Sequence, residues 1–125
     1  MTSEPTTVLV VDDEPLVVRL VELNLEMDGY RVVAAYDGPS GLRAAGEEHP
    51  DVIVLDMMMP GMDGLEVARH LKSDPGTATI PIIFLSARSS PADVAAGLAA
   101  GAAVYMAKPF DAEELSAKIA ELLKG

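Results

Sequence analysis

Short apolar runs alternate along this chain with longer segments in which apolar and polar residues are mixed. The short runs are rich in β-branched residues and predict strands over 8–11, 31–35, 52–55, 80–85 and 103–106. The mixed segments repeat apolar residues every three or four positions and predict helices over 15–27, 40–48, 65–72, 91–100 and from 111 onward. This strict alternation is typical of a parallel sheet with helices on both faces.

Local signals support several of the predicted helix ends. Pro15 suits a first helical turn, Gly29 suits a helix stop, and Ser90 suits an N-cap. In the first predicted helix the apolar spacing is carried by Leu16, Leu20, Leu23 and Met27. The fourth is rich in alanine and contains Gly97, so we expect it to bury little and to be weakly held.

Size and composition narrow the class of protein. The 125 residues, half of them hydrophobic, suit one domain with a packed core. The absence of cysteine excludes a disulfide framework, a thiolate zinc site and a catalytic cysteine, and it fits a reducing compartment. No apolar run approaches the roughly 18 residues of a membrane span, and residues 1–7 lack the features of a secretory signal. We therefore expect a cytoplasmic protein without a membrane partner.

The charge balance bears on nucleic-acid binding. The formal net charge is −11, from 20 acidic and nine basic residues, and the bases are scattered singly. Such a charge repels nucleic-acid phosphates, so we expect no direct contact between this chain and DNA or RNA.

Polar residues stand where several predicted strands end. Asp12 and Asp13 follow the first strand, Asp56 the third, Ser86 the fourth and Lys108 the fifth. Because the carboxyl ends of parallel strands share one edge of the sheet, these residues are expected to converge. Three neighbouring carboxylates call for a cation, and Mg²⁺ suits oxygen ligands. Lys108 and Ser86 suit phosphoryl oxygens, and Asp56 then suits a nucleophile.

Four motifs carry a resemblance to a known family. They are residues 10–15 (VVDDEP), 56–64 (DMMMPGMDG), 86–87 (SA) and 108–110 (KPF). In this order and spacing the chain resembles the receiver domain of bacterial two-component response regulators, as a single domain over residues 1–125 with a core of about 8–123. The resemblance implies a flavodoxin-like, doubly wound five-stranded parallel sheet of order 2-1-3-4-5 with five helices.

The resemblance also implies residue roles. Asp56 is expected to be the phosphoacceptor, with Mg²⁺, or Mn²⁺ in its place, bound by Asp13, Asp56 and the backbone carbonyl of Met58. Asp12 would act through water, and Lys108, Ser86 and the backbone N–H of Ala87 would contact the phosphoryl group. The phosphoryl source would be a histidine kinase or phosphotransfer protein. Such a domain catalyses its own phosphorylation and is not a turnover enzyme.

A switch is implied as well. Ser86 and Tyr105 match the family's switch residues, and the face made by the fourth helix, fifth strand and fifth helix would engage a downstream protein target or effector domain. The apolar Ala103 and Val104 before Tyr105, where many receivers have acids, hint at a protein partner or a homodimer.

Several residues are expected to have lesser roles. Met58 and Arg88, two positions beyond Asp56 and Ser86, are neither acids nor amides that could orient water, so we expect slow self-dephosphorylation. Glu14 is a first-turn acid near the site and a candidate for influencing metal binding. The bond between Lys108 and Pro109 is a candidate cis peptide. Loop and core packing is expected of Met57, Met58, Met59 and Met62, and exposure of His49 and His70.

Three alternatives are weaker. A haloacid-dehalogenase-like phosphatase needs an acid at position 58, where Met58 stands, and a flavodoxin-type electron carrier needs a Ser/Thr/Gly-rich loop in place of residues 12–15. A pseudo-receiver that only docks stays open, although its pocket positions hold competent residues. Whether the chain is a stand-alone regulator or a part of a longer protein is also open.

Overall fold

A parallel five-stranded sheet runs through the centre of the computed structural model, which describes residues 5–124; the start of the segment inspected for a secretory signal, residues 1–4, and residue 125 lie outside it. The strands lie in the order β2-β1-β3-β4-β5. Their bounds are β1 (Thr7–Val11), β2 (Arg31–Ala35), β3 (Val52–Asp56), β4 (Ile82–Ser86) and β5 (Val104–Ala107). All four pairings are parallel, so the predicted doubly wound, flavodoxin-like topology is confirmed.

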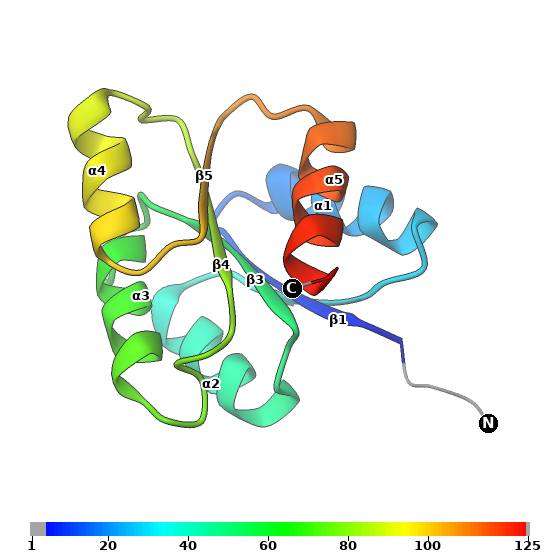
Figure 1. The fold of residues 1–125 in the computed structure, drawn as a ribbon, viewed down its shortest axis with the longest axis horizontal. Coiled ribbons are helices and arrows are strands. Elements are labelled where there is room, and N and C mark those ends of the chain that lie inside the picture. The colour runs from blue at the N-terminus through cyan, green and yellow to red at the C-terminus, as the bar shows by residue number, and fades with distance from the viewer. Residues whose placement is uncertain (1–4, 125) are drawn as a thin grey trace.

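Helices cover both faces of the sheet (Figure 1). Their bounds are α1 (Pro15–Met27), α2 (Gly38–Glu48), α3 (Gly64–Ser73), α4 (Pro91–Ala99) and α5 (Ala112–Lys124). α1 and α5 pack on one face, where Leu25 and Ile119 meet Val10 and Val54 of the central strands. α2 and α3 pack on the other face, and the central strands β1, β3 and β4 are buried on both faces along their whole length.

Some boundaries differ from those predicted. α2 begins two residues earlier than Ser40, because the side chain of Asp37 caps it by accepting a hydrogen bond from the Ser40 N–H at 2.8 Å. β4 begins at Ile82 and not at Ile80. The Ile80 N–H bonds the Thr77 carbonyl in a turn, and the Lys72 ammonium holds the Ile80 carbonyl at 3.0 Å, so this residue belongs to the turn.

The apolar spacing that indicates α1 marks its exposed face. Val18, Val21 and Leu25 are the residues of α1 that the sheet and α5 bury. The other apolar set projects outward: Leu16 is 79% and Met27 is 85% exposed, with Leu20 and Leu23 between them at 52% and 43%. α1 therefore carries apolar residues on two faces, and only one of them contributes to the core.

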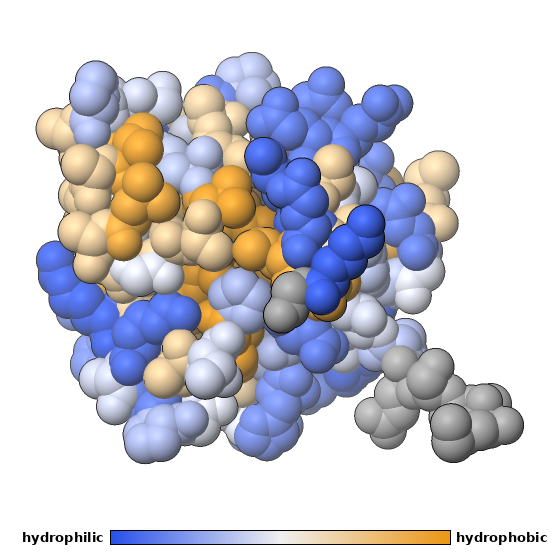
Figure 2. Space-filling view, viewed as in Figure 1, coloured by the Kyte–Doolittle hydropathy of each residue, from blue (hydrophilic) through white to orange (hydrophobic). Residues whose placement is uncertain are grey.

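α4 buries little, as its composition predicts. Gly97 is its one fully buried residue, and Leu98 is 47% exposed. Hydrophobic side chains gather on the surface over α4 and β5, whereas the surface over α5 is mainly hydrophilic (Figure 2). Within residues 5–124, no helix has the length and apolar character needed to cross a bilayer.

Candidate functional site

The site lies where the strands end, and backbone hydrogen bonds fix its residues. Asp12 follows β1, and its N–H donates to the Ala35 carbonyl of β2 at 3.1 Å. Asp56 is the last residue of β3 and pairs in register with Leu85. Lys108 follows β5, and its N–H donates to the Ser86 carbonyl at the end of β4, at 2.7 Å. The sheet register thus brings residues from four strands to one edge, as predicted.

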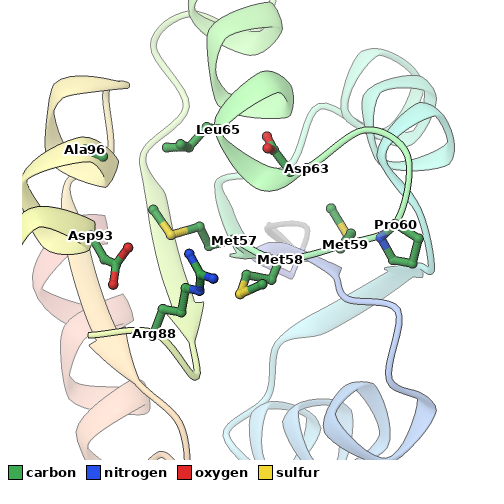
Figure 3. A pocket seen from close by; sticks show the side chains of 9 residues that line it. All are labelled: Met57, Met58, Met59, Pro60, Asp63, Leu65, Arg88, Asp93 and Ala96. Atoms are coloured by element: carbon green, nitrogen blue, oxygen red, sulfur yellow. The ribbon is translucent and has the colours of Figure 1, made fainter. Parts of the chain in front are cut away.

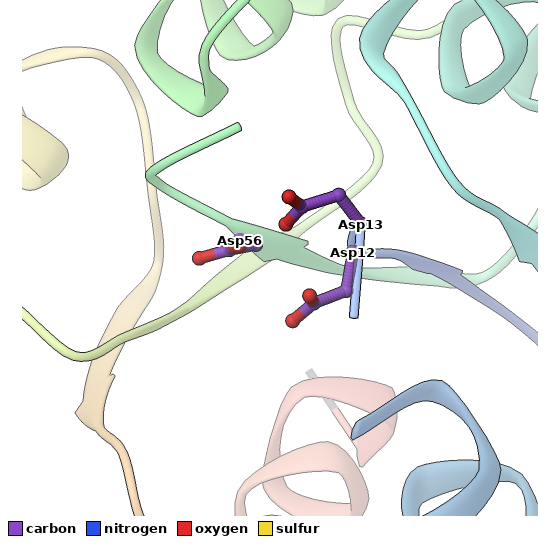
Figure 4. A group of neighbouring side chains, drawn as sticks. All are labelled: Asp12, Asp13 and Asp56. Carbon is purple, nitrogen blue, oxygen red and sulfur yellow. The ribbon is translucent and has the colours of Figure 1, made fainter. Parts of the chain in front are cut away.

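Three carboxylates converge at this edge. Each of Asp12, Asp13 and Asp56 offers an oxygen, and these oxygens all lie within 4.8 Å of one another (Figure 4). Asp12 and Asp56 are buried, with 2% and 4% of their surface exposed, and Asp13 is half-buried. Three negative charges at this spacing repel one another, so the cluster favours a bound cation.

Hydrogen bonding satisfies the buried acids only in part. Asp12 Oδ1 accepts the Glu14 N–H at 2.9 Å, and Asp56 Oδ1 accepts the Met58 N–H at 3.3 Å. Asp12 Oδ2 is buried, and within the described residues its polar contact is the ammonium of Lys108, 2.8 Å away. Three carboxylates grouped in this way fit a hard, oxygen-coordinated cation that carries water ligands.

Lys108 supplies the counter-charge. Its Nζ lies 2.8 Å from Asp12 Oδ2, 3.0 Å from Glu14 Oε1 and 3.6 Å from Asp56 Oδ1. Burial disfavours the charged ammonium, but the contacts with Asp12 and Glu14 outweigh burial and raise the pKa of Lys108. Lys108 is therefore charged at neutral pH and shared among three carboxylates.

The environment of Asp56 disfavours its ionised form. Burial and then the negative charge of Asp12 raise the pKa of Asp56 to about 7, against the opposing effects of the Lys108 charge and the Met58 N–H. A positive charge placed beside such a carboxylate stabilises its ionised form. An ionised carboxylate is the form that can act as a nucleophile.

Ser86 and Tyr105 lie on the two strands beyond Asp56. Ser86 is fully buried, and its Oγ accepts the Arg88 N–H at 3.1 Å. The Tyr105 hydroxyl donates to the Arg88 carbonyl and lies 3.2 Å from Met57 Sδ. Both side chains therefore contact the segment that follows β4, and Tyr105 is half-buried and not a free surface residue.

The Tyr105 ring occupies a slot between α4 and the sheet. Its centroid lies 6.0 Å from that of Phe84. A Cβ at Gly97 would lie 2.7 Å from Cδ2 of Tyr105 and 3.2 Å from the Phe84 ring. The missing side chain of Gly97 is what leaves room for the tyrosine.

A groove with a methionine-rich wall lies between the loop that follows β3 and helix α4 (Figure 3). Its volume is about 530 Å³, and Met57, Met58, Met59, Leu65, Ala96 and Arg88 contribute to its walls. Packing, the role expected for the methionines, holds for Met57 and Met59, which are buried, but is wrong for Met58, which is 48% exposed. Met58 lies in the loop between β3 and α3, between two buried methionines, and faces solvent.

Other sequence predictions have plain outcomes. The bond between Lys108 and Pro109, a candidate cis peptide, is cis. His49 and His70 are exposed, as expected. Glu14 has a more specific place than predicted, because its carboxylate reaches Lys108 across the sheet edge. One feature of the sequence could have indicated this role. Glu14 stands directly before Pro15, at an N-cap position where Ser, Thr, Asp or Asn is preferred.

Comparison with known proteins assigns the family. Residues 8–120 match the response regulator receiver domain. Over 123 residues the chain is 43% identical to the probable transcriptional regulatory protein TcrX of Mycobacterium tuberculosis, covering 98% of this chain and 51% of that protein. It is 43% identical over 117 residues to the alkaline phosphatase synthesis transcriptional regulatory protein PhoP of Bacillus subtilis, covering 94% of this chain and 48% of that protein. The chain thus spans about half the length of these curated relatives.

Solved structures agree with the sequence relatives. A putative response regulator from Chloroflexus aurantiacus matches with a TM-score of 0.93 at 35% identity, covering 98% of this chain and all of that one. The chemotaxis protein CheY4 of Vibrio cholerae matches with a TM-score of 0.91 at 32% identity, covering 96% of this chain and all of that one. These matches set aside the phosphatase and electron-carrier alternatives. The chain belongs to the response regulator receiver domain family.

Proposed function

We propose that this receiver domain accepts a phosphoryl group on Asp56 in the presence of Mg²⁺ and passes the signal to a protein partner. The observation that carries the proposal is the cluster of three carboxylate oxygens within 4.8 Å, beside the ammonium of Lys108. The donor would be the phosphohistidine of a histidine kinase or of a phosphotransfer protein. The domain would then be a signalling component that catalyses its own phosphorylation and loses the phosphoryl group slowly.

The metal would be held by Asp13, Asp56 and the carbonyl of Met58, with Asp12 bonded through water. The convergence of the three acids supports this arrangement, because oxygens of Asp12, Asp13 and Asp56 lie within 4.8 Å of one another and suit a hydrated, oxygen-coordinated ion. Mn²⁺ could replace Mg²⁺, since the ligands are all oxygens. When bound, the ion would neutralise charge on the phosphoryl group and on the acids.

In the transfer itself, a carboxylate oxygen of Asp56 forms a bond to phosphorus as the bond from phosphorus to the donor nitrogen breaks. The leaving nitrogen keeps the electron pair of that bond. Lys108, the Ser86 hydroxyl and the Ala87 N–H would then contact the phosphoryl oxygens. Lys108 suits this role because its Nζ lies 3.6 Å from Asp56 Oδ1.

The switch would follow from the change at Ser86. Its Oγ now accepts the Arg88 N–H, and a hydrogen bond from its hydroxyl to the phosphoryl group would draw the segment around Arg88 along. Tyr105 binds the Arg88 carbonyl, so its place in the slot beside Gly97 depends on that segment. The affected face, α4, β5 and α5, is apolar over α4 and β5 and suits a downstream target, an effector domain or a second copy of the chain (Figure 2).

Two features of the chain bear on its partners, namely an exposed apolar face and a negative charge. The exposed apolar residues of α1 begin two residues after Glu14 and offer a protein donor an apolar surface beside the site. They are Leu16, Leu20, Leu23 and Met27. Relatives named as transcriptional regulators include RpaA of Synechocystis, a DNA-binding regulator. The absence of direct nucleic-acid contact is therefore proposed only for this acidic domain, and its place in the cytoplasm likewise stays a prediction.

Incubation with acetyl phosphate tests the proposal. The intact mass should rise by one phosphoryl group with Mg²⁺ and should stay unchanged with excess EDTA or in Asp56→Asn. A wild-type protein that never gains the group would support the pseudo-receiver alternative. After removal of the donor, the group should persist for minutes or longer, because Met58 and Arg88 cannot orient an attacking water; loss within seconds would contradict slow self-dephosphorylation.

A further inference from the structure

Glu14 stands at the N-cap of α1 but does not cap the helix with its side chain. Its backbone is extended, with φ −95° and ψ 109°, and its carbonyl accepts the Val17 and Val18 N–H groups as an N-cap carbonyl should. Its carboxylate accepts no N–H of the first turn. A side-chain cap usually stabilises the N-terminus of a helix, and Glu14 does not provide one.

The carboxylate of Glu14 instead reaches Lys108, 94 positions away in sequence. Lys108 Nζ lies 3.0 Å from Glu14 Oε1 and 2.8 Å from Asp12 Oδ2, whereas the nearest oxygen of Asp56 lies at 3.6 Å. Of the three carboxylates that share this ammonium, Asp56 is the most distant. Before phosphorylation, the lysine is thus held mainly by residues that do not receive the phosphoryl group.

Glu14 acts at the mouth of the site and outside the group of candidate metal ligands. Its side chain is 61% exposed, whereas that of Lys108 is 11% exposed. The oxygens that come within 4.8 Å of one another belong to Asp12, Asp13 and Asp56, and Glu14 is not among them. An effect of Glu14 on the chemistry therefore runs through the lysine.

We propose that Glu14 is a positioning residue that competes with the phosphoryl group for Lys108 and thereby slows phosphorylation by small free donors. The proposal rests on the phosphorylation of Asp56 put forward above. For Lys108 to contact phosphoryl oxygens on Asp56, its ammonium must loosen the contact with Glu14. A free donor brings little binding energy to offset this loss, whereas a docked protein donor brings more. Glu14 would thus favour a protein donor over metabolic acyl phosphates.

The test compares Glu14→Gln and Glu14→Asp with the wild type. The glutamine keeps the length but loses the charge, and the aspartate keeps the charge but is one methylene too short. With acetyl phosphate at saturating Mg²⁺, Asp56 gains the phosphoryl group as acetate leaves with the electron pair of the broken P–O bond. Both variants should be phosphorylated about two to five times faster, the range expected for loss of one exposed ion pair.

Three further measurements locate the cause. In a Lys108→Ala background, Glu14→Gln should have no effect on the residual rate, because the partner through which it acts is gone. The affinity for beryllofluoride, a phosphoryl mimic, should rise in both Glu14 variants by a similar factor. The affinity for Mg²⁺ alone should change less than twofold.

Distinct outcomes separate the two proposals. A wild type that takes no phosphoryl group overturns the function proposed for Asp56. A wild type that is phosphorylated, with Glu14→Gln no faster, overturns the role of Glu14 alone. A rate gain in Glu14→Gln but not in Glu14→Asp would assign the effect to negative charge at the mouth and contradict competition for Lys108. A rate gain from Glu14→Gln that persists in the Lys108→Ala background would also contradict competition for Lys108.

Discussion

Removal of the Asp56 charge should stabilise the metal-free protein. The pKa of Asp56 is raised from 3.8 to about 7 by burial and by the charge of Asp12, so the folded protein holds this proton more tightly than the unfolded chain does. The free energy of unfolding therefore falls as pH rises from about 4 to about 7, because the unfolded chain loses this proton first. Above that range the contribution of the protonated Asp56 is lost. Asp56→Asn, which has no proton to lose, should escape this loss.

The size of the effect follows from the two pKa values. One pKa unit corresponds to 1.36 kcal/mol, so a rise from 3.8 to about 7 sets an upper value of about 4 kcal/mol for the cost of ionised Asp56 at pH 7.5. The pKa of about 7 already includes the attraction of the Lys108 ammonium at 3.6 Å, so the ion pair that the asparagine gives up needs no separate allowance. We expect Asp56→Asn to be more stable than the wild type by about 2–4 kcal/mol at pH 7.5 and by less at pH 5.

Urea denaturation in EDTA, followed by circular dichroism at pH 5, 6, 7 and 8, measures this difference. Glu47→Gln is the matched control, because Glu47 is exposed and is not part of the carboxylate cluster; it should change stability by less than about 0.5 kcal/mol. Mg²⁺ should narrow the gap by stabilising the wild type more than the variant. Equal stability of wild type and Asp56→Asn at every pH would refute the reasoning.

Three other substitutions test the packing and the metal ligands. Gly64→Ala would place a Cβ 2.3 Å from the Asp56 carbonyl oxygen and should lower the free energy of unfolding by about 1–3 kcal/mol in urea melts. The control is Gly46→Ala inside α2, whose Cβ would meet nothing within 4 Å and which should be neutral or stabilising. Equal effects of the two substitutions would contradict the packing at Gly64. Gly97→Ala should expel Tyr105 from its slot, seen as changed ring shifts in NMR spectra, and unchanged shifts would count against the slot. Asp13→Asn should weaken Mg²⁺ binding tenfold or more in a calorimetric titration, and an unaltered affinity would remove Asp13 from the ligand set.

The fold was predictable because its main signals are local. β1, β3 and β4 are continuously apolar, as strands buried on both faces must be, and the intervening segments have helical spacing. The place of Asp12, Asp56 and Lys108 then follows from topology, since parallel strands end at one edge. No side-chain detail is needed for either step.

Features that depend on which side of an element faces the core, or on the path of a side chain or loop, were not predictable. α1 has apolar residues on both its buried and its exposed face, so spacing alone cannot tell that Leu25 is buried and Leu20 is 52% exposed. The contact between Glu14 and Lys108 joins residues 94 positions apart and depends on the rotamers of two long side chains. The exposure of Met58 beside buried Met57 and Met59 depends on the path of one loop.

The most direct test of the central claim is to map the modified residue. After treatment with acetyl phosphate and Mg²⁺, borohydride reduction converts an aspartyl phosphate to homoserine, which tandem mass spectrometry locates in the digested chain. The account predicts homoserine at position 56, dependent on Mg²⁺ and strongly reduced in Asp13→Asn. Modification at another acid, or at Asp56 without any divalent ion, would contradict it.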